Sequence, residues 1–467
     1  PYITVKDAAL SEAYRRRYGS CHRQYALTVP FFERFFDLAV APEGAEVSKA
    51  GFVGKITANS FMKREFGKKL IETFLPRWDL THVIDTSLAY IPGHGTPTVI
   101  LFGRPRSPVS KGIRLVGAIK REDAEPDPPE SGKVWVAILD QIDRAGSVSD
   151  FVSVTDTQRD IFYHHPWSIG GGGAAELKET IDQAVENGNG SVLDTIADSV
   201  GFYQDTHADE AFVQPPDFAM RRGIPSAFMP QTRGDDLRDW SGPSAERILF
   251  PYERGTIEQW RSIPNTPAFA WFHALRTLMW ARSTFGGGTY RSNGRPWFDF
   301  HQFPKDRARC SHLIAFAFVA THNHFVLGHI GTVFNRSAPV IMLPAGSNRD
   351  NHFALVGLLN SAVGQFWMRQ VFHNKGGGGI GGGIAAESWE RFLEYDSTKI
   401  KQFPVPWERE AEGTDNPLRA AVMAVARDID TLAQARAQLL PTSLLAAPPS
   451  TQSALLQAAR TIVQLTR

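Results

Sequence analysis

The first 150 residues alternate between segments with a helical spacing of apolar side chains and short apolar runs. Residues 25–39 read "YALTVPFFERFFDLA", and their apolar positions recur every three or four residues, which predicts a helix. The stripe at this spacing consists of Leu27, Phe31, Phe32, Phe35 and Leu38. The run "GFVGKITANSF" begins with Gly and contains Val, Ile and Thr, which predicts a buried strand.

A second helix is predicted directly after this strand. Ser60 is a suitable N-cap, and Pro76 marks the end. Between them, apolar residues recur at a spacing of four: Met62, Phe66, Leu70 and Phe74. This periodicity predicts one continuous helix.

Further strands are predicted on the C-terminal side of this helix. "LTHVIDT" and "TPTVILFGR" are separated by "AYIPGHG", whose Pro and Gly residues indicate a loop. The two strands are expected to form an antiparallel edge of the sheet. "IRLVGAI" and "KVWVAIL" are expected to add strands near the acidic, Pro-rich break "REDAEPDPPES". The order strand, helix, strand, strand is typical of an α/β fold.

From about residue 151 the pattern becomes irregular. Gly runs occur among aromatic-rich segments, and four of these are predicted as short strands: "RILFPYE", "PWFDFHQF", "FVLGHIGTVF" and "PVIMLP". Helices are predicted at "AWFHALRTLMWA" and "HFALVGLLNSAVGQFWMRQVF", and the C-terminus is expected to form two helices separated at Pro441 and "AAPPS". We therefore expect three segments, 1–150, 151–410 and 411–467, of which the irregular middle is typical of a recognition module rather than a catalytic scaffold.

Composition narrows the class of protein only slightly. The 467 residues carry 50 Lys and Arg against 49 Asp and Glu, a balance that neither requires nor excludes nucleic acid. The two cysteines exclude a disulfide framework and a cysteine-built zinc ribbon, and they favour a cytoplasmic location. The apolar runs are too short to cross a bilayer, so no membrane partner is expected.

The Gly runs do not match a phosphate-binding loop. None has the Lys-Ser/Thr ending of a Walker motif, and no GxGxxG lies between a strand and a helix in the first 150 residues. The runs are either tight turns or places where the backbone approaches a polyanion. "HNKGGGGIGGGI" favours binding, because His373, Asn374 and Lys375 add hydrogen-bond donors beside a backbone without side chains.

Two further groups of side chains could bind a ligand. Arg15, Arg16, Arg17 and Arg23 either bind DNA phosphates or form a solvated helix face. "HNH" at residues 322–324 places two histidines on one face of a strand, but the carboxylates and spacing of a metal site are not evident, so no metal is predicted.

Several segments together resemble one known family. "PYITVKD", the blocks around residues 25–75 and 80–104, "HPWSIGGGGAAELK", "LVGLLNSAVGQFWMRQVFHNKGGGGIGGGI" and "KQFPVPW" are similar to consecutive parts of adenine-specific DNA methyltransferases of phage growth limitation (BREX-type) defence systems. The resemblance covers nearly the whole chain. It implies the C-terminal half of a Rossmann-like methyltransferase sheet, a mixed α+β target-recognition region and a helical C-terminus.

The resemblance also implies roles for particular residues. Pro1 and Tyr2 match the last two residues of the family's Asn-Pro-Pro-Tyr motif, in which the Tyr ring stacks on a flipped adenine. The place of a second stacking ring is taken by Ile91, with Tyr90 beside it. The implied cofactor is S-adenosyl-L-methionine, and the implied partners are double-stranded DNA and other phage-defence proteins.

The chain is expected to begin inside that motif and to lack the cofactor-binding half, so by itself it is expected to be inactive. The alternative is a non-catalytic DNA-binding or specificity module of a defence or restriction–modification complex. A fused nuclease is a third and weaker alternative, because the required metal-binding set is not found in the sequence.

Overall fold

The structure, a computed structural model, describes residues 3–42, 49–93, 95–244, 246–329, 331–375, 392–408 and 416–438, together with residues 457 and 460. These divide into two compact units. The first consists of Pro1–Ala184 and Phe366–Glu394, and the second of Val185–Gln365 and Tyr395–Arg467. None of the described helices is long and apolar enough to cross a membrane.

The first unit is built around a five-stranded sheet with the order β1-β3-β2-β4-β5. Its strands are β1 (Val53–Ala58), β2 (Asp79–Asp85), β3 (Thr98–Arg104), β4 (Gly112–Ala118) and β5 (Val152–Gln158). β2 and β4 are parallel, and the other neighbours are antiparallel. The strands predicted at β1 to β4 and the α/β pattern are therefore confirmed, although β1 rather than the β2–β3 pair forms the edge.

Two apolar clusters cover the two faces of this sheet. Alternate side chains of β3 point to opposite faces of the sheet. Val99 and Leu101 belong to one cluster, and Ile100 and Phe102 pack against the other. The first cluster includes residues of α2 (Thr28–Leu38), and the second includes residues of α3 (Lys133–Gln141). The remaining helices of this unit are α1 (Ala8–Arg17), α4 (Ala174–Glu186) and most of α12 (Ala362–Val371).

The helix α2 was predicted correctly, but the predicted apolar stripe is buried only in part. Val29, Phe32 and Phe36 are buried, whereas Phe31, Phe35 and Leu38 are 38–62% exposed. Two apolar stripes lie side by side on this helix, and only the position of the sheet selects between them. The exposed rings of Phe31 and Phe35 stack on each other and lie near the ammonium group of Lys55 in β1.

The helix predicted after β1 is replaced by short turns of 3-10 and π geometry, Asn59–Met62, Glu65–Gly67, Leu70–Phe74 and Leu75–Arg77. The four predicted apolar residues are all buried. The continuous helix was wrong because the chain folds tightly back at Gly67, where a Cβ atom would lie 1.8 Å from the carbonyl oxygen of Phe61.

"KVWVAIL" was wrongly predicted as a strand and forms α3. Val134, Ala137 and Ile138 are buried at a helical spacing over the sheet. The buried carboxylate of Glu122 accepts hydrogen bonds from the backbone N–H groups of Lys133 (2.9 Å) and Val134 (3.0 Å). This contact caps the helix from a residue outside it, which a local sequence pattern does not reveal.

The second unit contains two four-stranded sheets and a small two-stranded one. The first sheet consists of β14 (Val333–Phe334), β9 (Phe228–Thr232), β10 (Glu246–Leu249) and β8 (Val213–Gln214). The second consists of β13 (Phe325–His329), β11 (His312–Phe316), β15 (Val340–Met342) and β7 (Ser199–Gly201). The small sheet pairs β17 (Pro404–Val405) with β6 (Ser191–Val192). Three of the four predicted short strands are thus confirmed. The mixed α+β character of this region is confirmed as well.

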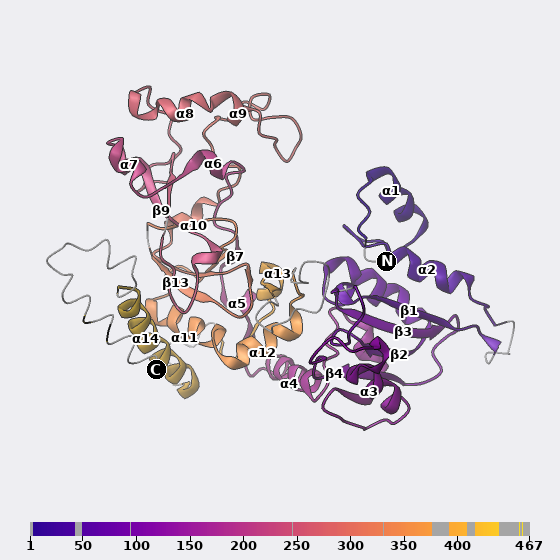
Figure 1. Ribbon diagram of the computed structural model, residues 1–467. Helices are drawn as coiled ribbons and strands as arrows, with labels where there is room; N and C mark the ends of the chain where they lie inside the picture. Colours follow the sequence, from indigo (N-terminus) through magenta and orange to yellow (C-terminus); the bar gives the residue numbers. More distant parts are fainter. Residues whose placement is uncertain are drawn as a thin grey trace. The chain divides into compact units, whose positions relative to one another are not determined.

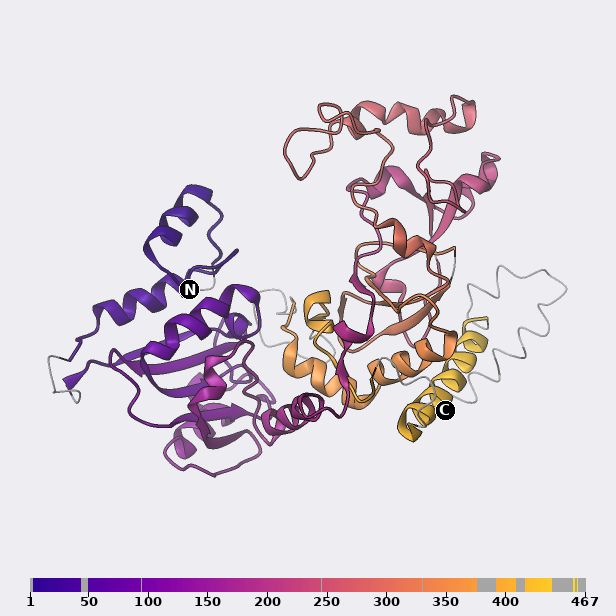
Figure 2. The same cartoon turned by 180° about the vertical axis from the view of Figure 1, so that it is seen from behind.

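The helices of the second unit pack around these sheets. α11 (Arg349–Leu359) lies beside α14 (Pro417–Gln438) in both views (Figures 1 and 2), and a Cβ atom at Gly357 would lie 2.8 Å from Val422. The other helices are short: α5 (Leu193–Ile196), α6 (Asp209–Phe212), α7 (Phe218–Arg221), α8 (Ala270–Ala274), α9 (Arg276–Trp280), α10 (Lys305–Arg309) and α13 (Ser397–Ile400).

Three predictions fail in this region. The helix predicted at residues 270–281 is divided into α8 and α9 at Leu275. "PWFDFHQF" forms turns, because its aromatic rings, among them the buried Phe298 and Phe300, enter an aromatic core instead of a ladder. The single helix predicted over residues 352–372 is divided into α11 and α12 at Asn360 and Ser361. The side-chain oxygen of Asn360 accepts a hydrogen bond from the N–H of Phe325 (3.0 Å), which ties the break to β13.

The second helix predicted at the C-terminus lies outside the described residues, apart from residues 457 and 460.

Candidate functional site

A pocket of about 220 Å³ lies in the first unit, where β1 and β2 end and β3 begins. Four segments line it: the turn after β1, the turn after β2, residues 168–170 and residues 369–374 at the end of α12. In open α/β sheets, ligands bind in crevices at the ends of the strands. This position and the polar walls make the pocket the candidate functional site.

Hydrogen bonds between neighbouring strands shape the floor of the pocket. The N–H of Asn59 donates to the carbonyl of Pro97 (2.9 Å), which ties the turn after β1 to the start of β3. The hydroxyls of Thr86 and Thr98 lie 2.7 Å apart and join the end of β2 to the same place. Backbone polar groups therefore keep hydrogen-bond partners where the chain leaves the sheet at this end.

One wall is attached through Lys63, which lies in the turns after β1. Its ammonium group donates to the backbone carbonyls of Arg369 (3.0 Å) and Phe372 (3.1 Å). On the other side, the hydroxyl of Ser168 donates to the side-chain oxygen of Gln370 (3.2 Å). Residues 369–374 are distant in sequence from the sheet, and these contacts hold them against it.

Asp85 places a carboxyl group at the base of the pocket. The group is buried, and one oxygen accepts a hydrogen bond from the N–H of Ser87 (2.9 Å). Burial raises the pKa of Asp85, because the charged form loses its hydration.

The rim of the pocket is formed where residues 373–375 pair with residues 392–394. Asn374 and Leu393 form an antiparallel bridge, and the carboxylate of Glu394 lies near both His373 (3.5 Å) and Lys375 (2.7 Å). Contact with His373 and then Lys375 lowers the pKa of Glu394 to about 2. The chain between these two segments, residues 376–391 with the Gly run, lies outside the described residues.

Among the residues predicted as a DNA-binding group, His373 and Asn374 line the pocket and Lys375 follows them. Their role in binding DNA stays a prediction. The other predicted DNA-binding group lies on α1 and the loop after it, where Arg16 is 80% exposed and Arg15 donates to the backbone carbonyl of Arg23. Arg17 lies over the ring of Tyr18.

The predicted catalytic residues Pro1 and Tyr2 lie outside the described residues. The next residue is placed, since the carbonyl of Ile3 accepts a hydrogen bond from the N–H of Leu27 (2.9 Å). At the position of the second stacking ring, Ile91 lines the pocket, while the hydroxyl of Tyr90 donates to Glu125 (3.3 Å).

The sequence reasoning missed Asn59, Lys63, Asp85 and Gln370. A signal was available for two of them, because Asn59 and Asp85 are polar residues placed where apolar strands end. Lys63 and Gln370 carry no such signal, since their role depends on a contact between segments that are far apart in the chain.

A comparison with curated proteins confirms the resemblance found in the sequence. The chain is 44% identical over 421 residues to the adenine-specific methyltransferase PglX of Streptomyces coelicolor. The match covers 87% of this chain and 34% of the relative, so the chain spans about a third of the length of the curated relative it matches. No family model matches the chain.

Two solved structures are similar to the chain at low sequence identity. The type IIG restriction endonuclease BpuSI matches at 11% identity with a TM-score of 0.36, over 92% of this chain and 48% of that one. The type IIL restriction-modification enzyme MmeI, in complex with DNA, matches at 12% identity with a TM-score of 0.48, over 88% and 46%. Both TM-scores are below 0.5, so neither likeness establishes a shared fold.

Proposed function

We propose that this chain is part of a DNA adenine N6-methyltransferase that acts in defence against bacteriophages. The observation that carries the proposal is the 44% identity to PglX over 87% of the chain. The sheet of the first unit then corresponds to the C-terminal half of a Rossmann-like methyltransferase sheet, with β1 to β4 in the segment 1–150 and β5 directly after it. Residues 151–410 form the target-recognition region, and residues 411–467 form the helical C-terminus. The partners are double-stranded DNA and other phage-defence proteins.

The chemistry explains which groups such an enzyme needs. The lone pair of adenine N6 is delocalised into the ring, so the amino group is a weak nucleophile. The enzyme flips the base out of the duplex, stacks it on an aromatic ring and offers acceptors to the amino hydrogens. Tyr2 is the stacking ring in this proposal, and Pro1 is the second Pro of the motif.

The pocket beside β1 and β2 is proposed to receive the flipped base. Its volume of about 220 Å³ is below the roughly 300–1,000 Å³ of cavities that hold a drug-sized ligand. A single base is small enough for such a space. Asp85 and Gln370 supply polar groups there, and Ile91 supplies an apolar wall.

S-adenosyl-L-methionine is the proposed methyl donor, but the residues of this pocket do not fit the whole cofactor. The pocket is too small for the adenosine and the amino-acid arm together. The described residues of this chain are therefore assigned to the base and to DNA. The 467-residue chain by itself is expected to be inactive.

The test is the transfer of isotope-labelled methyl groups from S-adenosyl-L-methionine to DNA. A longer protein that contains this chain is expected to label adenine N6, and the 467-residue chain alone is not. Gln370→Ala and Asp85→Asn in the longer protein are expected to slow transfer by about tenfold or more, because a misplaced base loses its alignment. Gln158→Ala, on the exposed end of β5, is the matched control.

The outcomes separate the proposal from its alternative. DNA binding without methyl transfer by the longer protein would support a non-catalytic specificity module. Clear turnover by the 467-residue chain would contradict its proposed dependence on a further cofactor-binding part. Unchanged transfer in both pocket variants would place the base elsewhere while leaving the methyltransferase proposal intact.

A further inference from the structure

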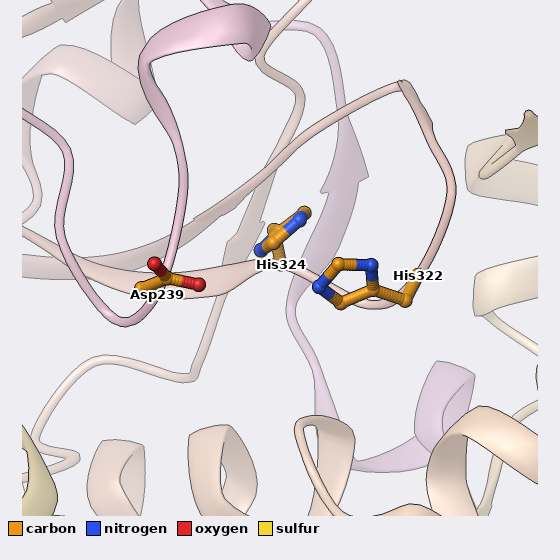
Figure 3. A group of neighbouring side chains, drawn as sticks. All are labelled: Asp239, His322 and His324. Atoms are coloured by element: carbon orange, nitrogen blue, oxygen red, sulfur yellow. The ribbon is translucent and has the colours of Figure 1, made fainter. Parts of the chain in front are cut away.

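The second unit brings together three side chains that are far apart in the sequence: Asp239, His322 and His324 (Figure 3). One ligand atom from each lies within 4.8 Å of the other two. Asp239 lies on the loop between β9 and β10, and the histidines lie just before β13. His324 is buried, whereas Asp239 and His322 are exposed, so the group is open to solvent on one side.

Asp239 is held by a tight turn. Arg238 and Ser241 exchange two backbone hydrogen bonds of 2.9 and 2.8 Å, and the two residues between them, Asp239 and Trp240, have φ angles of 48° and 64°. This is the geometry of a two-residue hairpin turn with left-handed central residues. Asp tolerates that conformation better than most residues, and the turn directs its carboxylate towards the histidines.

The two histidines are held through the residue between them. The N–H of Asn323 donates to the side-chain oxygen of Gln365 (2.8 Å), and its amide group donates to the carbonyl of Leu359 (2.6 Å). These bonds attach the turn to the break between α11 and α12. The two imidazole rings consequently lie with their centres 4.1 Å apart.

We propose that Asp239, His322 and His324 form a binding site for a divalent transition-metal ion of the zinc class. Two imidazole nitrogens and one carboxylate oxygen are a donor set that such ions accept, with water completing the coordination. Mg²⁺ and Ca²⁺ prefer oxygen donors and suit the site less well.

Zinc sites are mostly tetrahedral, and two donors at Zn–N bonds of about 2.1 Å then lie about 3.4 Å apart. The ligand atoms here lie within 4.8 Å of one another, so side-chain rotations that bring them up to about 1.4 Å nearer to each other complete the site. The hydroxyl of Thr321 lies 2.9 Å from Nδ1 of His322, a contact of the kind that orients a ligating imidazole with Nε2 towards the metal.

The neighbouring charges are compatible with one bound ion. Arg436 of α14 lies 3.0 Å from one carboxylate oxygen of Asp239, and the second oxygen remains for the metal. Arg238 is the other cation nearby, and its guanidinium donates to the backbone carbonyls of Gly234 and Leu237.

The expected consequence is structural. A bound ion would join the turn of Asp239 to the start of β13 and would therefore stabilise the second unit. This site lies within the second unit alone, so its existence does not depend on the proposed methyl transfer.

The experiment uses the whole 467-residue chain after removal of metals by chelation. Titration with Co²⁺ is expected to give a saturable visible absorbance with a stoichiometry of one, and Zn²⁺ is expected to displace it and to raise Tm. Asp239→Asn, His322→Ala and His324→Ala are each expected to weaken binding by about tenfold or more. His164→Ala, an exposed histidine of the first unit, is the control and is expected to bind normally.

Asp239→Asn and His322→Ala change exposed residues, so they remain informative if the buried His324→Ala fails to fold. Circular dichroism without metal checks the fold of each variant. The absence of saturable binding, or the same affinity in the wild type and in these two variants, overturns the proposal.

Discussion

The carboxylate of Glu394 lies 2.7 Å from the ammonium group of Lys375. This contact joins the segments that precede and follow residues 376–391, at the rim of the candidate pocket. The same carboxylate lies 3.5 Å from Nε2 of His373, and its side chain is 14% exposed. One acidic group therefore holds two of the predicted DNA-binding residues in place.

Replacement of Glu394 by Gln is expected to lower the free energy of unfolding by about 1–2 kcal/mol at neutral pH, because the contacts with both cations are weakened. Since the pKa of Glu394 is lowered from 4.5 to about 2, its contribution is fully present above pH 4.5 and is lost as the pH falls towards 2. Denaturant unfolding at several pH values measures both effects. Glu130→Gln, at an exposed position, is the control. A parallel pH dependence in wild type and Glu394→Gln would contradict the assignment.

Lys55 of β1 is predicted to make stability rise with pH. It is 6% exposed, its ammonium group lies 4.3 Å from the centre of the Phe32 ring, and it donates to the carbonyl of Thr28 (2.8 Å). Burial lowers its pKa from 10.5 to about 7. Between these values the unfolded chain binds a proton that the folded chain does not, so the free energy of unfolding increases with pH in this window.

We expect Lys55→Met to remove this dependence. The stability of the wild type relative to Lys55→Met should increase by about 1–3 kcal/mol between pH 7 and pH 10. Lys111→Met, which changes an exposed lysine, should leave the pH profile of the wild type unchanged. A constant difference between wild type and Lys55→Met would show that Lys55 stays charged throughout.

Gly171→Ala is expected to destabilise the first unit. A Cβ atom at this position would lie 2.3 Å from the carbonyl oxygen of Gly117 in β4 and 2.8 Å from the hydroxyl of Ser153. Overpacking of this kind costs about 1–3 kcal/mol, which thermal unfolding measures as a lower Tm. Gly19→Ala, where no atom lies within 4 Å of the added group, is the matched control. Equal Tm values for the two variants would show that β4 and the loop of Gly171 can move apart without loss of stability.

Tyr2→Ala tests the proposed stacking ring in a longer protein that contains this chain. Methyl transfer is expected to fall by a much larger factor than DNA affinity, because stacking of the flipped base supports the transition state. Methylation assays and DNA-binding titrations on the same preparation give the two factors. Equal losses in both would assign Tyr2 a structural role.

The spacing of apolar residues predicted an element correctly where the element has one clearly apolar face. The strands β1 to β4 and the helix α2 were predicted because their apolar residues recur with periods that short segments reveal. The prediction failed for α3, whose apolar run suits a strand or a helix equally. There the buried carboxylate of Glu122, which caps the helix, and the sheet beneath it selected the helix.

The candidate pocket was predicted only in part. His373 and Asn374 were found because they stand beside an unusual Gly run. Lys63 and Gln370 were missed, because their importance comes from contacts with backbone and side chains more than two hundred residues away. Asp239 was missed as a partner of His322 and His324 for the same reason, and the sequence alone therefore predicted no metal.

The sequence by itself determined the strand-forming and helix-forming segments, the absence of a disulfide framework and the resemblance to adenine-specific methyltransferases. These features depend on residue types and on spacings of a few residues. The tertiary structure decided which stripe of α2 is buried, where the chain breaks between α11 and α12, and which polar groups meet at the pocket and beside β13. Those outcomes depend on packing between segments that are far apart in the chain, because the surface that a segment covers determines its conformation and its buried face.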